Sequence, residues 1–199
     1  MATFLDKIFS SKIEVDLAKI DLEAALSFQD MRVDTVLAKH ILEGTVGEAM
    51  RQDYFCFLGK MAVLEETVPL TIAEELQLLT HYLKLCEKCD GSPIFVRSDI
   101  RMETDKSIAP LLTFPLVANA LRYGYNSMVI YPLKVKIRAL ENMLLIEVSN
   151  RVNHHMASQE NTSIISRYKN RLLSVYPNRH TLLFNSNSNT FKAYLQLHW

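Results

Sequence analysis

The chain has 199 residues, of which 49% are hydrophobic, and its 22 Lys and Arg side chains are balanced by 22 Asp and Glu side chains. A chain of this size and composition can bury a substantial core, which argues against intrinsic disorder. The zero net charge gives no overall field to attract DNA, an anionic membrane or an acidic substrate. No basic cluster stands out in the sequence either, so we expect no nucleic-acid partner.

The first segment, MATFLDKIFSSK, lacks the basic start and the apolar stretch of a signal peptide. The longest apolar run, IAPLLTFPLVANAL, is short and interrupted by prolines, so we expect no membrane span and a cytoplasmic location. In that compartment Cys56, Cys86 and Cys89 are expected to be reduced thiols. Cys86 and Cys89 can supply at most two ligands from one helix, which disfavours a zinc site.

The first part of the chain has the pattern of a helical hairpin. Apolar residues recur at helical spacing from Lys12 to Glu43, with no Pro or Gly before Gly44, which predicts one long amphipathic helix. A second helix is predicted from Val46 to about Glu65, after a short turn that contains glycine. Two antiparallel helices of this kind can pair through an exposed stripe with a second copy, which would give a four-helix bundle in a homodimer.

The rest of the chain mixes helices and strands. A third helix is predicted from Thr71 to about Lys88, with Thr71 and Glu74 at the spacing of a capping box. The elements expected after it are a strand over IFVRSDIRM, a helix from about Ser107 to Tyr125, a strand hairpin over LKVKIRALENMLLIEVSN, a helix from about Ile164 to Val175 and two strands within HTLLFNSNSNTFKAYLQLHW. The predicted fold class is therefore α+β, a helical hairpin followed by an α/β sandwich with a mixed sheet.

Two stretches of this second part carry a recognisable pattern. Leu70–Leu85 reads LTIAEELQLLTHYLKL, and Pro110–Gly124 reads PLLTFPLVANALRYG. They resemble the phrases L-x-x-E-L-x-L-x-x-x-Y-L-x-I and P-L-L-x-Q-P-L-V-E-N-A-x-K-H-G of the LytS/YehU-type sensor histidine kinases, whose ATP-binding domains have the GHKL fold. Further on, SIISRYKNRLLSVY places Arg171, Leu172 and Tyr176 in register with the helix that follows the family's lid.

The resemblance covers about Val68 to the C-terminus. It implies a GHKL domain over residues 68–199, preceded by a dimerisation and phosphotransfer-like hairpin over residues 1–67. The cofactors that it implies are ATP and Mg²⁺.

The resemblance also implies roles for single residues of a nucleotide site. In the family, the Asn of the Glu-Asn pair coordinates the Mg²⁺ that bridges the nucleotide phosphates, and Asn119 occupies that position. Ala118 replaces the glutamate that acts near the γ-phosphate, so base or water-positioning chemistry lacks its agent. Thr162 and Ile164 replace lid glycines, whose bare backbone approaches the phosphates. Asn119 is otherwise a buried amide that neighbouring backbone satisfies.

Asn150 aligns with the acid that contacts adenine and is still able to pair with an exocyclic amine, whereas the glycine after it is replaced by Arg151. The family's phospho-acceptor lies in P-H-F-L-F-N-x-L-N on the first helix. The corresponding region here is LSFQDMRVDTVLAKHI, where Asp30 or Met31 falls at the acceptor position. His40, later on the same predicted helix, is a weak candidate for a phosphorylated residue.

Together these residues favour a histidine-kinase-like signalling protein, a pseudokinase or adaptor in a two-component pathway, over an active kinase. Its implied partners are a related histidine kinase or a response regulator that docks on the helical bundle. Two alternatives remain open: an active ATP-binding histidine kinase whose site residues are misaligned above, and an ATP-independent histidine phosphotransferase that uses His40.

Overall fold

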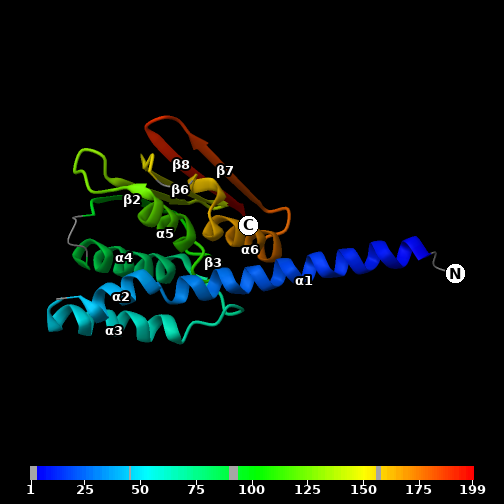
Figure 1. The fold of residues 1–199 in the computed structure, drawn as a ribbon, viewed down its shortest axis with the longest axis horizontal. Coiled ribbons are helices and arrows are strands. Elements are labelled where there is room, and N and C mark those ends of the chain that lie inside the picture. The colour runs from blue at the N-terminus through cyan, green and yellow to red at the C-terminus, as the bar shows by residue number, and fades with distance from the viewer. Residues whose placement is uncertain (1–3, 45, 90–93, 156–157) are drawn as a thin grey trace.

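The computed structural model describes residues 4–44, 46–89, 94–155 and 158–199. Its first three helices are α1 (Phe4–Arg32), α2 (Thr35–Glu43) and α3 (Glu48–Ala62). α1 and α3 run in opposite directions, and the N-terminal part of α1 extends beyond the rest of the molecule (Figure 1). The predicted N-terminal helix pair is therefore present, ahead of a region with a mixed sheet.

The prediction of one continuous helix from Lys12 to Glu43 is wrong, because a break separates α1 from α2. Asp34 lies at the break. Its carboxylate accepts hydrogen bonds from the backbone N–H groups of Val36 at 2.9 Å and Leu37 at 3.2 Å, which makes it the N-cap of α2. The same carboxylate pairs with the guanidinium of Arg122 at 3.0 Å, so the break is fixed by a residue distant in sequence.

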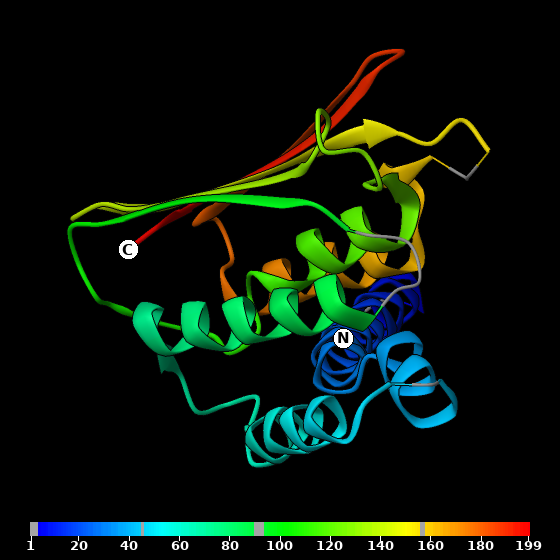
Figure 2. The same cartoon turned by 90° about the vertical axis from the view of Figure 1, so that its left-hand side faces the viewer.

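A mixed sheet forms one layer of the molecule (Figure 2). Its main path, in spatial order, is β2 (Val96–Met102), β5 (Leu133–Ala139), β6 (Met143–Val152), β8 (Thr190–His198) and β7 (His180–Ser186). β2 runs parallel to β5 and the other neighbours are antiparallel. The short strand β4 (Gly124–Tyr125) also pairs with β6. The predicted strand hairpins and the α+β fold class are confirmed.

Helices cover one face of this sheet (Figure 2). They are α4 (Ile72–Cys89), α5 (Phe114–Tyr123) and α6 (Ser163–Val175), with the single-turn 3-10 helix η1 (Gln159–Asn161) just before α6. Alternate residues of β5 and β6 point toward these helices and are buried, while their neighbours face the other side. We call the side without described helices the open face of the sheet.

The start of α4 follows the predicted capping box. The backbone N–H of Thr71 donates to the carboxylate of Glu74 at 2.8 Å, and the N–H of Glu74 donates back to the Thr71 hydroxyl at 3.2 Å. The helix predicted from Ser107 to Tyr125 is too long at its start: β3 (Ser107–Ile108) pairs with β1 (Leu70–Thr71), and a loop follows before α5.

The first helix packs against the last one. In α1, Asp21 accepts a hydrogen bond from Ser174 at 2.9 Å, and Glu23 accepts one from Asn170 at 2.7 Å, both in α6. The hydrophobic core is continuous from Phe28 in α1 to the inner face of the sheet. Among the helices of the described ranges, none combines the length and the apolar composition that crossing a bilayer requires.

Candidate functional site

Asn119 lies in the middle of α5 and is only 1% exposed. Its side-chain amide donates to the backbone carbonyl of Gln159 at 3.0 Å, and its oxygen accepts from the hydroxyl of Thr162 at 2.7 Å. Both ends of the amide are therefore bonded to the segment that enters α6. A ligand can reach Asn119 only if this segment moves away.

Asn150 lies on the inner face of β6 and is joined to the same segment. Its amide nitrogen donates to the side-chain oxygen of Gln159 at 3.0 Å and to the backbone oxygen of Arg151 at 2.7 Å. The Asn150 oxygen and the Gln159 side-chain nitrogen are buried, and within the described residues neither has a hydrogen-bond partner. Gln159 thus links the two asparagines that the sequence singled out, and these two atoms are the only unsatisfied ones in the link.

Gly124 allows this approach of α5 to β6. A Cβ atom at Gly124 would lie 2.3 Å from the Asn150 amide nitrogen and 2.5 Å from the backbone oxygen of Ala120. Both distances are far below van der Waals contact, so any larger residue must displace a backbone carbonyl. The last residue of the PLLTFPLVANALRYG stretch therefore has a packing reason to be glycine.

The two positions that align with lid glycines have structural roles in this chain. Thr162 is the N-cap of α6: its hydroxyl accepts from the N–H of Ile165 at 3.3 Å while donating to Asn119. Ile164 is buried in the core. Neither position exposes bare backbone N–H groups to a phosphate in the way glycine does.

These residues do not fit a Mg²⁺–nucleotide complex. The Asn119 oxygen, the one metal ligand that the resemblance implies, accepts a hydrogen bond from Thr162 and is buried, so its second lone pair is covered unless the segment before α6 moves. Ala118 offers no carboxylate, and it is buried. Within the ranges that the structure describes, no three His, Cys, Asp or Glu side chains gather closely enough to hold a metal ion. Within the described residues, the Asn150 oxygen and the Gln159 side-chain nitrogen are the atoms of this network that have no hydrogen-bond partner.

The loop over residues 109–113, just before α5, is bonded to a buried charged side chain. Glu75 in α4 is completely buried, and its carboxylate accepts from the N–H of Leu111 at 2.7 Å and from the N–H and the hydroxyl of Thr113, both at 2.8 Å. Leu111 has a φ of 57°, a left-handed conformation that is costly for a bulky residue. The Glu75 carboxylate thus stabilises a strained backbone segment.

Side chains of α6 bind the same loop from the other side. Arg171 donates to the carbonyls of Pro110 at 2.5 Å and Leu111 at 3.4 Å. Tyr168 donates to the carbonyl of Leu112 at 2.7 Å, and the Tyr176 hydroxyl accepts from the N–H of Ala109 at 2.7 Å. A buried loop must satisfy its backbone groups, and these contacts do so. Arg171 and Tyr176, which matched the family pattern, therefore act on the loop.

Burial sets the ionisation of this cluster. Removal from water raises the pKa of Glu75, although the hydrogen bonds from Thr113 and Leu111 and the charge of Arg171 oppose that rise. Burial also lowers the pKa of Arg171 and raises the pKa of Tyr168. We name Glu75, Arg171, Tyr168 and Tyr176 the loop clamp. The family pattern includes Arg171 and Tyr176, but it did not indicate that these side chains bind the loop before α5.

The candidate acceptor positions are placed on two different helices. Asp30 in α1 forms an ion pair with Arg167 of α6, and Met31 is buried in the core. His40 lies on α2, is exposed, and lines a small cavity of about 70 Å³ together with Tyr82 and Arg122. His154 and His155 lie in an exposed turn.

The cysteines do not form a site in the described part of the chain. Cys56 is exposed on α3, and Cys86 is buried in α4. The side chain of Cys89 lies outside the described residues.

No protein-family model matches this sequence, and no curated protein matches it. Solved structures of histidine kinases align with this chain at low identity and at TM-scores below 0.5. The Acinetobacter baumannii histidine kinase AdeS is 8% identical over 75% of each chain, with a TM-score of 0.48. The histidine kinase domain of the Erythrobacter litoralis EL346 blue-light activated histidine kinase is 9% identical over 90% of this chain and 95% of its own, with a TM-score of 0.47. A histidine kinase from Burkholderia phymatum STM815 is 9% identical over 92% and 97%, with a TM-score of 0.45.

Proposed function

We propose that this chain is a histidine-kinase-like signalling protein that acts as a pseudokinase or adaptor, without autokinase chemistry. The observation that carries the proposal is the link through Gln159, which uses the side chains of both Asn119 and Asn150 inside the protein. Ala118 in place of a carboxylate adds support, because phosphoryl transfer then lacks the group that would position the nucleophile. The motif resemblance supports the choice of family, and the geometry of the Asn119–Gln159–Asn150 link supports a protein without kinase activity.

The proposal includes a homodimer built by the N-terminal region, residues 1–67, beside a GHKL-like domain, residues 68–199. Leu22 and Leu26 on α1, with Val33 just after its last residue, recur at positions i, i+4 and i+11, and all three are exposed. Leu22 is 62% exposed and Val33 47% exposed. A stripe of this kind on a helix suits a helical bundle with a second copy.

Light scattering tests the dimer. We expect the wild-type chain to be a dimer and the double variant Leu22→Glu/Val33→Glu to be a monomer that keeps its circular dichroism spectrum. Leu183→Glu is the control, since Leu183 is equally exposed but lies on β7. A wild-type monomer at micromolar concentration would remove the bundle from the proposal.

A second candidate function is ATP-independent phosphotransfer through His40, favoured by one observation: its exposure on α2. Incubation with a ³²P-phosphorylated response regulator separates this function from the adaptor. The adaptor proposal expects no label on the chain, and the His40→Gln variant serves as the control. Label on the wild-type chain that His40→Gln abolishes would replace the adaptor with a phosphotransferase. A related kinase or response regulator remains the proposed partner in both cases.

A further inference from the structure

Basic residues that are separated in the sequence lie together on the open face of the sheet. Because side chains alternate along a strand, every second residue of β2, β5, β6 and β8 lies on this face. The basic residues placed there are Arg97, Arg101, Lys134, Lys136, Arg138, Arg151 and Lys192, against only Asp99 and Glu147. No run of basic residues reveals this cluster in the sequence, since the charges come from four strands.

The two acidic residues neutralise only part of this charge. Asp99 pairs with Arg138 at 2.5 Å and with Arg101 at 3.8 Å. Glu147 pairs with Lys136 at 3.6 Å and with Lys192 at 3.2 Å.

Three cations remain without a carboxylate in ion-pair distance, within the part of the chain that the structure describes: Arg97, Lys134 and Arg151. Arg97 is the register partner of Lys134, Lys134 is the partner of Ser149, and Arg151 follows Ser149 on the same face. Neighbouring strands lie about 4.8 Å apart and same-face residues of one strand about 6.7 Å apart. The three unneutralised cations are therefore gathered at one end of the sheet.

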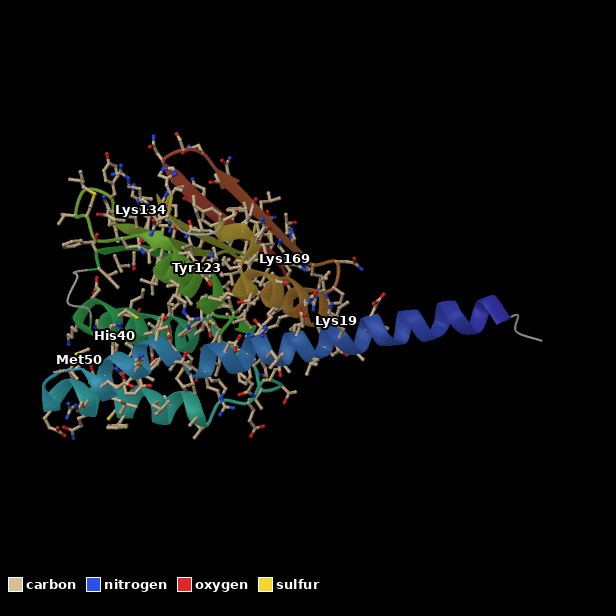
Figure 3. The ribbon with its side chains drawn as sticks, viewed as in Figure 1. Lys19, His40, Met50, Tyr123, Lys134 and Lys169 are labelled. Atoms are coloured by element: carbon tan, nitrogen blue, oxygen red, sulfur yellow. The ribbon has the colours of Figure 1, made fainter. Side chains whose placement is uncertain are left out.

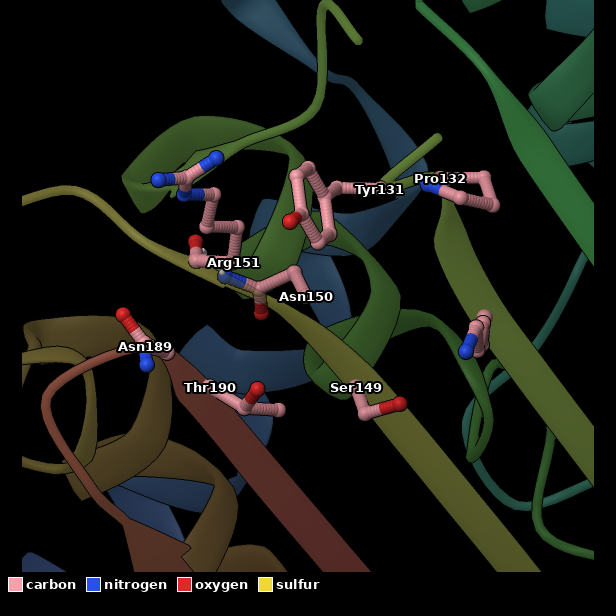
Figure 4. Close-up of a pocket in the computed structure, with 8 residues that line it drawn as sticks. Tyr131, Pro132, Ser149, Asn150, Arg151, Asn189 and Thr190 are labelled. Carbon is pink, nitrogen blue, oxygen red and sulfur yellow. Dashed lines mark hydrogen bonds between the residues drawn. The ribbon is translucent and has the colours of Figure 1, made fainter. Parts of the chain in front are cut away.

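A pocket of about 190 Å³ lies beside two of these cations, Lys134 and Arg151 (Figure 4). Lys134 and Arg151 line it together with the hydroxyl residues Ser149 and Thr190 and the amide residues Asn150 and Asn189. None of its lining residues carries a carboxyl group. Since water takes about 30 Å³ in the liquid, this volume has room for a phosphate group with a small substituent.

Arg151 is held in place for binding. Its guanidinium stacks on the ring of Tyr131, with 4.6 Å between the guanidinium carbon and the ring centroid. One of its nitrogens also lies 3.6 Å from the sulfur of Met128. Stacking fixes the plane of the guanidinium and leaves its other N–H groups in that plane, which suits bidentate donation to a phosphate.

We infer that this pocket binds a phosphorylated small molecule, with its phosphate between Lys134 and Arg151 and the hydroxyls of Ser149 and Thr190 as further donors. Asn150 lines the pocket and also bonds to Gln159 in the network around Asn119, so the two sites share this residue. The inference is carried by the groups on the open face and does not require the proposed function. It needs only the cations, donors and volume described above.

Titration of the full chain with glycerol 3-phosphate, inorganic phosphate and glycerol, followed by amide chemical shifts at constant ionic strength, tests the inference. We expect saturable binding of both phosphates but not of glycerol, with the largest shifts near Tyr131, Ser149, Arg151 and Thr190. Lys134→Gln and Arg151→Gln should each weaken binding about tenfold, the loss of one charge-assisted contact. The variants are judged only if their melting temperatures match the wild type.

Lys136→Gln is the matched control. Lys136 lies two residues along the same strand and face but is paired with Glu147, so we expect less than about a threefold change. Absence of saturable phosphate binding would overturn the inference. So would equal losses in Lys134→Gln and Lys136→Gln, or stronger binding of a single-stranded oligonucleotide or of anionic phosphatidylserine vesicles that all these variants weaken alike, because those results describe an extended polyanion surface.

Discussion

Two buried polar networks adjoin α5, and they differ in kind. The loop clamp before the helix contains a buried carboxylate and a buried guanidinium, and it satisfies the backbone of a strained loop. The network around Asn119 and Asn150 consists of neutral amides and one hydroxyl. Within the described residues it leaves two buried side-chain atoms unsatisfied, whereas the clamp leaves one, the Nε of Arg171. Buried charge is costly to remove, whereas neutral hydrogen bonds contribute less. We therefore expect the clamp, which supports α5, to contribute more to the free energy of unfolding than the amide network, whose residues resemble a nucleotide site.

Removing the clamp carboxylate should have the largest effect. Glu75→Ala leaves the buried N–H groups of Leu111 and Thr113 without acceptors, and we expect it to lower the free energy of unfolding by about 3–5 kcal/mol. Urea denaturation measures this. Glu74→Ala, at the exposed neighbouring position, removes only the capping-box contact and should cost about 1 kcal/mol. Equal costs for the two variants would mean that the clamp adds nothing beyond ordinary capping.

A larger residue at Gly124 should disturb the close contact between α5 and β6. Gly124→Ala places a Cβ against the Asn150 amide and the Ala120 carbonyl, and we expect a loss of about 1–3 kcal/mol. Gly59→Ala is the matched control: Gly59 is in α3 with nothing within 4 Å of its would-be Cβ, and it should gain about 0.5–1 kcal/mol. Thermal unfolding of both variants gives the comparison. A neutral Gly124→Ala would show that Gln159 and Asn150 tolerate displacement.

Disrupting the amide network should lower the free energy of unfolding by less than removing Glu75. Thr162→Val removes the α6 cap and the bond to Asn119, which should cost about 1–2 kcal/mol in urea denaturation. Thr181→Val, on the exposed side of β7, should stay within about 0.5 kcal/mol of the wild type. If Thr162→Val costs as much as Glu75→Ala, the contrast between the two networks is wrong.

The contribution of Glu75 to the free energy of unfolding should decrease gradually as the pH rises. Because burial raises the pKa of Glu75 above its ordinary 4.5, the native state holds this proton more tightly than the unfolded state does. The stability contributed by Glu75 is therefore fully present below pH 4.5 and declines as the pH rises through the raised pKa. Measured against pH, the stability of Glu75→Gln relative to the wild type should improve over that window. A relative stability that worsens with rising pH would mean that the hydrogen bonds have lowered the pKa instead.

Local patterns were sufficient for much of the fold. The Thr71–Glu74 capping box and the strand hairpins rest on short-range rules, and the structure has them. The break at Asp34 was missed, because its partner Arg122 lies far along the chain. The role of Glu75 was missed for the same reason. Its neighbours Ile72 and Leu79 mark an apolar face of the helix, but the sequence does not show that the loop before α5 lies against this face and donates hydrogen bonds to Glu75.

The candidate site divides in the same way. The sequence identified Asn119, Asn150 and Ala118 through a motif. It did not indicate that Gln159 would join the two asparagines, because this contact depends on how the segment before α6 enters the fold. The cationic pocket was invisible for a similar reason, since strand register alone brings Lys134 and Arg151 together.

Calorimetric titration of the full chain with ATP and Mg²⁺ tests the central claim most directly. If the Asn119–Gln159–Asn150 network uses the site internally, no saturable binding should occur at Asn119 at micromolar nucleotide, and Asn119→Ala should give the same trace as the wild type. Micromolar binding of ATP with Mg²⁺ that Asn119→Ala abolishes would contradict the account and restore an active nucleotide site.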